Sequence, residues 1–170
     1  MKKPGQWLGA ALLGACLVTA AACGGDDGPS DTPEADAAPP LFPENYRDTF
    51  TMVRDCRSST SHDFHKIVVW ADAAAAGPYV DRDAPIPEGA VILKEEFDIG
   101  DTACEDEVVE YAIMKRLAPG EAPEEHLDWF WQDLDADRNV TSTNDSLCWG
   151  CHDDCDGDPA AEFDHTCAVP

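Results

Sequence analysis

The chain has 170 residues, of which 35 are acidic and 11 are basic, so its formal net charge is −24 at pH 7. A surface this acidic is repelled by phosphates, which excludes nucleic acid as a partner and disfavours docking onto an anionic membrane surface. The same charge would attract a basic redox partner, although general solubility explains it equally well.

The first 22 residues have the pattern of an export signal. A basic start at residues 1–3 precedes an uncharged, apolar stretch over residues 7–22, which is too short to span a bilayer comfortably. This stretch ends in three alanines before Cys23 and resembles the lipobox of bacterial lipoproteins, in which the cysteine carries lipid. Cys16 also follows small residues, but it leaves a shorter apolar region. We expect a lipid-anchored protein of the cell envelope, in the periplasm or on the outer-membrane face, with simple cleavage or an uncleaved anchor as alternatives.

Residues 23–44 are predicted to be a disordered linker, because they are rich in Gly, Asp, Pro, Ala and Ser and hold almost no large apolar side chain. The folded domain is therefore expected over residues 45–170. Without residues 1–22 the chain keeps 9 basic and 35 acidic residues, a formal charge of −26. Export also places the cysteines where disulfides persist.

The elements of the domain can be predicted in chain order. A proline near its start and apolar residues at spacings of four and three predict a helix over residues 43–57. The β-branched run at residues 66–71 predicts a strand, and Asp72 is expected to cap a short helix over the alanines 73–76. These elements predict an α+β fold, mainly an antiparallel β-sheet with flanking helices. Further strands are predicted over residues 89–97, 107–117 (with a helix as the rival interpretation) and 128–134, the last followed by a turn at residues 135–139.

The most specific motif is Cys148-Trp149-Gly150-Cys151-His152, which has the spacing of a c-type haem attachment site. On one helical turn the thiols of Cys148 and Cys151 can reach both vinyl groups of a porphyrin, and His152 can then ligate the iron. We expect one covalently attached haem c on a short C-terminal helix. The alternatives are a disulfide between these two cysteines and a zinc knuckle completed by Cys155 and a histidine.

Four further cysteines, Cys56, Cys104, Cys155 and Cys167, allow three disulfide pairings. We favour Cys56 with Cys104, which would tie the first helix to a hairpin. We also favour Cys155 with Cys167, which would close a short loop after the haem motif. Either bond would stabilise the domain by roughly 2–4 kcal/mol.

Other residue types that bind metals have simpler explanations here. Met114 is expected in the core rather than on the iron, and His165 is expected to face solvent in a loop-rich tail. His62 and His65 flank the start of a strand and show no ligand spacing. Aromatic side chains that pack on the porphyrin or in the core are expected at Trp129, Phe130 and Trp131.

Five segments occur in a distinctive order: Asn45-Tyr46-Arg47, Phe64-His65-Lys66-Ile67-Val68-Val69, Pro87-Glu88-Gly89-Ala90-Val91-Ile92-Leu93-Lys94-Glu95, Asp128-Trp129-Phe130-Trp131 and the haem motif. In this order they resemble the P-460 cytochromes, which share a fold with the cytochromes c-prime-beta. The resemblance covers about residues 45–165, and it implies a mainly antiparallel β fold with helices, in agreement with the predicted elements. The four additional cysteines and the acidic residues 153–158 depart from the family and indicate a subgroup.

In P-460 cytochromes a lysine is covalently joined to the haem macrocycle, and the resemblance implies this role for Lys94. On a strand Lys94 would share a face with Ala90, Ile92 and Glu96. A lysine on an inward face is costly unless it is paired, neutral or bonded. A salt bridge with Glu96 and an exposed strand end are the alternative explanations.

The resemblance also implies a carboxylate before the haem motif that accepts protons in the active members. Asp145 is the candidate in this chain, beside Thr143 and Asn144. The alternative role of Asp145 is to cap the helix that bears the haem motif.

An iron held by His152 alone would leave one face open to a small nitrogen-containing ligand. The resemblance implies either oxidation of hydroxylamine-like compounds, as in P-460 cytochromes, or binding of nitric oxide, as in c-prime-beta proteins. An electron-carrier cytochrome and a structural lipoprotein without haem, held by disulfides, are the alternatives. Family members often dimerise, so a homodimer is a further expectation.

Overall fold

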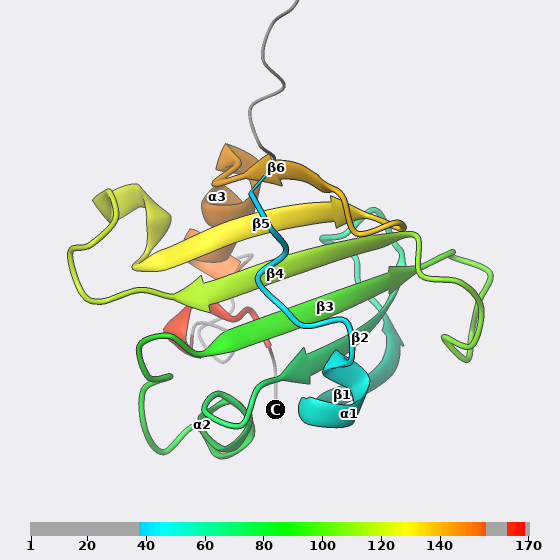
Figure 1. Ribbon diagram of the computed structural model, residues 1–170, viewed down its shortest axis with the longest axis horizontal. Coiled ribbons are helices and arrows are strands. Elements are labelled where there is room, and N and C mark those ends of the chain that lie inside the picture. Colours follow the sequence, from blue (N-terminus) through cyan, green and yellow to red (C-terminus); the bar gives the residue numbers. More distant parts are fainter. Residues whose placement is uncertain (1–37, 156–162, 169–170) are drawn as a thin grey trace, which may run out of the picture. The chain divides into compact units, whose positions relative to one another are not determined.

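The computed structural model describes residues 38–155 and 163–168, so the predicted signal segment, Cys23 and most of the predicted linker lie outside the described residues. Within them, six strands form one antiparallel sheet in which each strand pairs with the next along the chain (Figure 1). The predicted α+β fold with a mainly antiparallel sheet is confirmed. The elements are α1 (Tyr46–Thr49), β1 (Thr51–Ser58), β2 (Lys66–Ala71), α2 (Ala76–Asp81), β3 (Val91–Phe97), β4 (Glu110–Arg116), η1 (Glu124–His126), β5 (Trp129–Asp135), β6 (Val140–Thr143), α3 (Ser146–Asp154) and η3 (Phe163–His165).

None of the helices in the described part of the chain has the length and apolar character needed to span a membrane. The predicted lipid anchor at Cys23 concerns residues that the structure does not describe, and it stays a prediction.

Strand β3 shows how the sequence gives the sheet two buried faces. Successive side chains of a strand point to opposite faces. Val91 and Leu93 belong to a buried cluster on one face, whereas Ile92 belongs to a cluster on the other face. The side chain of Lys94 lies on the same face as that of Ile92. Because β3 lies in the middle of the sheet and both of its faces are covered, its apolar residues form a nearly continuous run.

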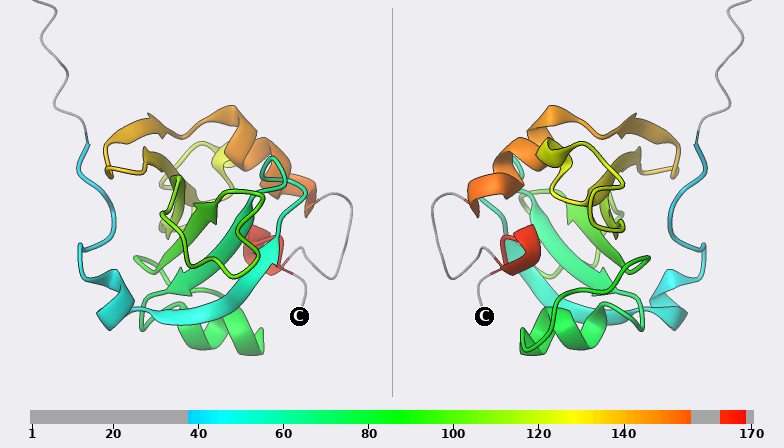
Figure 2. Two further views of the ribbon diagram at one scale, coloured as in Figure 1. Left: turned by 90° about the vertical axis from the view of Figure 1, so that its right-hand side faces the viewer. Right: turned by 90° about the vertical axis from the view of Figure 1, so that its left-hand side faces the viewer.

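One face of the sheet is covered by the N-terminal segment of the described chain (Figure 2). We call it the N-terminal face. Phe42 packs against Tyr46 and Tyr111, with ring centroids 5.1 and 5.3 Å from that of Phe42, and Leu93 belongs to the same buried cluster. This face is thus filled by aromatic and aliphatic side chains together.

The other face, which we call the α3 face, is covered by α3 and by residues 163–168 (Figure 2). Its cluster contains Ile92, Met114, Trp129 and Trp131. Met114 is therefore a core residue, as predicted. Trp129 and Trp131 are both buried, and Phe130 on the opposite side of β5 is partly buried.

The folded part begins earlier than residue 45, the boundary expected from the sequence. Phe42 is only 3% exposed, and the backbone N–H of Leu41 donates to Oε1 of Gln132 at 3.0 Å. The amide of Gln132 also donates to the carbonyl of Pro39 at 3.1 Å. The end of the predicted linker is thus attached to β5, because a buried glutamine on that strand satisfies its backbone groups.

The predicted helix over residues 43–57 is wrong. A helix is present only as α1, and the chain continues as β1, which pairs with β2. Tyr46 and Phe50 belong to the N-terminal face, whereas Val53 packs on the α3 face. The apolar spacing that suggested one helical stripe therefore serves two faces of a sheet.

The next predicted elements are largely confirmed, with shifted boundaries. Asp72 accepts hydrogen bonds from the backbone of Ala74 and Ala75 at 3.0 and 2.8 Å, and it also accepts from Val91 at 3.0 Å. It therefore shapes the turn that precedes α2, and the helix itself begins later than predicted. The segment over residues 107–117 forms strand β4 rather than a helix, and the turn at residues 135–139 leads into β6, a short strand that was not predicted.

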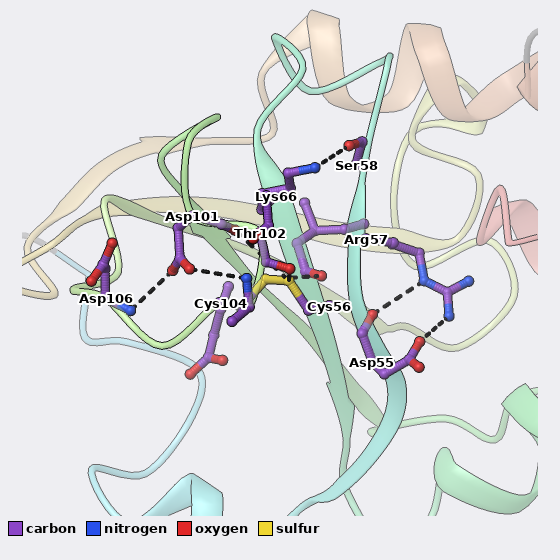
Figure 3. Close-up of a disulfide and its surroundings, with 12 residues drawn as sticks. Asp55, Cys56, Arg57, Ser58, Lys66, Asp101, Thr102, Cys104 and Asp106 are labelled. Carbon is purple, nitrogen blue, oxygen red and sulfur yellow. Dashed lines mark hydrogen bonds and ion pairs between the residues drawn. A yellow bond between two sulfur atoms is a disulfide. The ribbon is translucent and has the colours of Figure 1, made fainter.

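The Cys56–Cys104 disulfide joins β1 to the loop between β3 and β4, with the two Cα atoms 5.6 Å apart (Figure 3). The pairing is the one favoured from the sequence, but it ties a strand to a loop and not a helix to a hairpin. Asp101 shapes this loop, because its carboxylate accepts from the backbone N–H groups of Ala103 and Asp106 at 3.2 and 2.9 Å.

Candidate functional site

A cavity of about 700 Å³ lies on the α3 face of the sheet, between the sheet, α3 and the C-terminal segment. Its volume falls within the roughly 300–1,000 Å³ that cofactor sites occupy. Cys148, Cys151 and His152 all line it from α3. The sheet side is lined by residues that include Ile67, Val69, Ile92, Lys94, Glu96, Glu110, Ala112, Met114, Trp131 and Asp133.

Helix α3 is attached to β5 by the residue two positions before its start. Asn144 has a φ of 51°, a left-handed conformation that asparagine adopts more readily than most residues. Its side-chain oxygen accepts from the backbone N–H of Trp131, and its own N–H donates to the carbonyl of Trp131, both at 3.0 Å. This pair of bonds sets the point at which α3 leaves the sheet.

Asp145 caps α3. Its backbone is extended, and its Oδ1 accepts from the N–H of Leu147 at 2.8 Å. Asp145 does not belong to the residues that line the cavity. The capping alternative raised by the sequence is therefore confirmed. The role of Asp145 as a proton acceptor stays a prediction.

The two cysteines of the motif lie one helical turn apart on α3, and neither is in a disulfide. The thiol of Cys148 is half-buried, and its Sγ lies 3.6 Å from Oδ2 of Asp133 on β5. Burial and the Asp133 carboxylate raise the pKa of Cys148 to about 12, so this group is a protonated thiol. Cys155 forms a disulfide with Cys167, as favoured from the sequence, which removes the fourth ligand of the zinc-knuckle alternative.

His152 is held in one tautomer. Its Nδ1 lies 2.5 Å from the carbonyl oxygen of His165, which can only accept, so Nδ1 carries the proton and Nε2 carries the lone pair. The ring also lies 4.8 Å from the ring of Trp131, measured between centroids. Burial, together with the charge of Lys94, lowers the pKa of His152 to about 3. A neutral imidazole bonded through Nδ1 to a carbonyl is the form in which histidine ligates metals.

The expectation that His165 faces solvent is wrong. His165 is partly buried, and its Nδ1 donates to the carbonyl of His152 at 3.2 Å. The prediction failed because it took the loop-rich character of the tail as a sign of exposure, whereas the Cys155–Cys167 disulfide holds the end of the tail against α3.

Lys94 lies on the cavity wall, on the face predicted from the strand alternation. Its Nζ contacts Nε2 of His62, and Nδ1 of His62 lies 2.9 Å from Oε1 of Glu96. His62 thus stands between Lys94 and Glu96, in place of the direct salt bridge that was one alternative. Burial lowers the pKa of Lys94 to about 8, although Glu96 and Asp133 act in the opposite direction.

His62 and His65 were not predicted as site residues. Both bind Glu96, His65 through its Nδ1 at 3.0 Å from Oε2. A signal for them exists in the register of the sheet, because Glu96 pairs with Ile67 in the antiparallel ladder. The loop just before β2 must therefore come close to Glu96.

The residues around the cavity fit a c-type haem. Two thiols outside any disulfide and one neutral imidazole on a single helix line a space that is bounded on the sheet side by both apolar and charged side chains. In residues 38–155 and 163–168, no group of three or more histidine, cysteine or acidic side chains is arranged to hold a bare metal ion. The donor set suits a porphyrin with its own four nitrogen ligands better than a metal bound by the protein alone.

Comparison with known proteins gives one finding. The family model described as Cytochrome P460 matches residues 43–159, which is more than half of the chain. None of the curated proteins matches. The matched residues include the six strands and α3, and with them the part of the cavity wall that the sheet and α3 supply. The chain belongs to the Cytochrome P460 family, and membership of this family implies a c-type haem as its cofactor.

Proposed function

We propose that the protein is an exported monohaem c-type cytochrome that acts on, or binds, a small nitrogen compound such as hydroxylamine or nitric oxide. Cys148 and Cys151 would form the thioether bonds and His152 would ligate the iron. The observation that carries this proposal is that all three residues line the same cavity, with the His152 tautomer already set for a metal. When bound, the haem supplies a redox-active iron with one open face.

Lys94 supports the hydroxylamine-oxidising form of this proposal. Its amine lies on the cavity wall, and with a pKa of about 8 a sizeable fraction of it is neutral near physiological pH. Only a neutral amine has the lone pair needed to bond a porphyrin carbon. We propose that Lys94 is joined to the haem macrocycle, as in P-460 cytochromes, with His62 and Glu96 holding the amine in place. The new N–C bond would replace one N–H bond of the amine and one C–H bond of the porphyrin, and a two-electron oxidant such as a peroxide would take up the electrons.

Asp145 favours the second form, a nitric-oxide-binding cytochrome with an unmodified haem. Oxidation of a nitrogen ligand requires a group that accepts its protons, and Asp145 caps α3 instead. The carboxylates that do line the cavity are Glu96, Glu110 and Asp133. Burial and the neighbouring acids raise the pKa of Glu110, which makes it a stronger base than an ordinary glutamate. If the protein does oxidise its ligand, Glu110 would therefore be the proton acceptor in place of Asp145.

The mass and the absorption spectrum of the purified holoprotein separate these forms. A covalent adduct of one haem with a strongly red-shifted Soret band supports oxidation chemistry with a bonded Lys94. One haem with an ordinary c-type spectrum, and binding of nitric oxide to the ferrous iron, supports the second form. An ordinary spectrum with reversible reduction and no nitric oxide binding indicates an electron carrier. A mass without haem, after expression with haem-maturation machinery, contradicts the whole proposal and leaves a structural lipoprotein.

The location and partners of the protein are part of the same proposal. Lipidation of Cys23 would anchor the domain to the cell envelope, and the acidic surface would suit a basic redox partner. A Cys23→Ala variant should leave the membrane fraction, whereas a Cys16→Ala variant should remain there. Sedimentation of the soluble domain tests the expected homodimer.

A further inference from the structure

The segment over residues 163–168 folds back onto the end of α3 and exchanges hydrogen bonds with the haem motif. Nδ1 of His152 donates to the carbonyl of His165, and Nδ1 of His165 donates to the carbonyl of His152, at 2.5 and 3.2 Å. Each histidine therefore fixes the other through its main chain. The first of these bonds is the one that determines which nitrogen of His152 carries a lone pair.

Three contacts hold this segment in place. The Cys155–Cys167 disulfide joins it to the end of α3, with Cα atoms 4.9 Å apart. The indole of Trp129 donates to the carbonyl of Asp164 at 3.0 Å, and the carboxylate of Asp164 accepts from the backbone of Ile86 at 2.6 Å. The segment is thus connected both to α3 and to the sheet.

The backbone of the segment needs these contacts. Asp164, His165 and Cys167 have φ values of 45, 59 and 50°, and Cys155 has a φ of 46°. Side chains other than glycine rarely adopt this left-handed region, and each such residue costs about 1 kcal/mol or more unless its surroundings hold it there. A free tail would leave this conformation, and the carbonyl of His165 would move away from His152.

We propose that residues 163–168, with the Cys155–Cys167 disulfide, form a brace that positions the iron ligand through the carbonyl of His165. This inference rests on the proposed role of His152. A carbonyl that accepts from Nδ1 fixes the ring orientation of a metal-binding histidine and makes its other nitrogen a stronger donor. A stronger donor stabilises ferric over ferrous iron, so the brace lowers the midpoint potential of the haem.

The alternative is that the disulfide is only a staple that stabilises the fold. The chain offers a matched control, because neither cysteine of the Cys56–Cys104 disulfide is among the residues that line the cavity, whereas Cys155 and Cys167 line it. Both disulfides restrict the unfolded chain. Only one of them holds an acceptor against His152.

The test compares two holoproteins, Cys155→Ser with Cys167→Ser and Cys56→Ser with Cys104→Ser. The iron–histidine stretching band in the resonance Raman spectrum of the ferrous haem and the midpoint potential are measured for each. We expect the first variant to show a band at lower frequency and a higher potential, and the second to keep the values of the wild type. Equal values in all three proteins would overturn the brace, and so would equal shifts in both variants.

A second measurement tests the brace even if the Cys155→Ser, Cys167→Ser variant does not fold. The Cys56→Ser, Cys104→Ser holoprotein is treated with a thiol reductant, which leaves thioether bonds intact and can cut only the Cys155–Cys167 disulfide in the folded protein. The Raman band should then shift as in the first variant, and mass spectrometry after alkylation should count two new thiols. Two new thiols without a shift would overturn the brace, whereas absence of covalent haem would overturn the proposed function instead.

Discussion

Two neighbouring carboxylates on β3 lie on opposite faces of the sheet and are held in different ways. Glu95 is 1% exposed on the N-terminal face, and Glu96 is 4% exposed on the α3 face. Both positions bury a charge, which is costly without partners. The kinds of partner that each residue has distinguish a structural face from a functional one.

Glu95 is surrounded by donors that do not change their charge. The hydroxyl of Tyr46 donates to Oε1, the guanidinium of Arg47 lies 2.6 Å from the same oxygen, and the indole of Trp70 donates to Oε2 at 2.9 Å. Burial and the bond to Glu95 raise the pKa of Tyr46, so its phenol stays protonated and continues to donate. This network fastens α1 to the sheet.

Glu96 is held by side chains that line the cavity. His62 and His65 bind its two oxygens, and both are about one quarter exposed as side chains. His62 also contacts the amine of Lys94 through its other ring nitrogen, so His62 links the carboxylate of Glu96 to Lys94. Glu96 and these partners all line the cavity, whereas Glu95 does not, and this is why we assign Glu96 to the site and Glu95 to the fold.

The largest expected effect is on the α3 face. Replacing Cys148 and Cys151 by serine removes both thiols that line the cavity, so we expect complete loss of covalent haem on a denaturing gel stained for haem. Replacing Cys56 and Cys104 by serine should leave the stain unchanged. Haem that stays covalently attached without the first two thiols would contradict the assignment of the site.

Lys94 gives a sharper form of the comparison. In a Lys94→Met variant the red-shifted Soret band expected for the wild type should return to the position of an ordinary c-type haem, because no amine remains to bond the porphyrin. Lys66→Met is the matched control, since Lys66 lies on the neighbouring strand and its Nζ donates to Ser58 at the surface, at 2.6 Å (Figure 3). Identical spectra for both variants would show that Lys94 is not bonded to haem.

The N-terminal face should respond in stability and not in spectrum. A Glu95→Ala variant leaves Tyr46, Arg47 and Trp70 without their acceptor, which should lower the free energy of unfolding by about 3 kcal/mol. Urea denaturation followed by fluorescence measures this as a lower midpoint with an unchanged slope. A Soret band that moved in this variant would contradict the separation of the two faces.

The sequence predicted the α3 face well where the signals are local. The spacing of Cys148, Cys151 and His152 within one helical turn predicts a c-type haem attachment site without knowledge of the fold. The alternation along β3 was enough to put Lys94 on the face of Ile92. Each of these signals is contained within a few neighbouring residues of the sequence.

The remaining site residues depend on contacts between distant segments. His62 reaches Glu96 only because of the register between β2 and β3, which alternation alone does not specify. The contact of His165 with His152 depends on where the C-terminal segment folds back. The helix predicted over residues 43–57 failed for a related reason, because short apolar spacings fit a helix and a strand equally well until their packing partners are known.

The smallest expected effect is the pH dependence of the stability that Glu96 contributes. Burial alone would raise the pKa of Glu96, but the bonds and charges of His62, Lys94 and His65 lower it overall. The unfolded chain therefore takes up the proton first as the pH falls, so the stabilisation by Glu96 is present above about pH 4.5 and is lost as the pH falls through the lower folded value. A Glu96→Gln variant should be less stable by about 1 kcal/mol at pH 7. The difference in the free energy of unfolding from the wild type should shrink between pH 5 and pH 3 in urea titrations.

Glu88→Gln, in the exposed turn before β3, is the control and should have the stability of the wild type at every pH. A difference at Glu96 that stays constant down to pH 3 would mean that its histidine partners do not hold the ionised carboxylate, and the contrast with Glu95 would then rest on position alone.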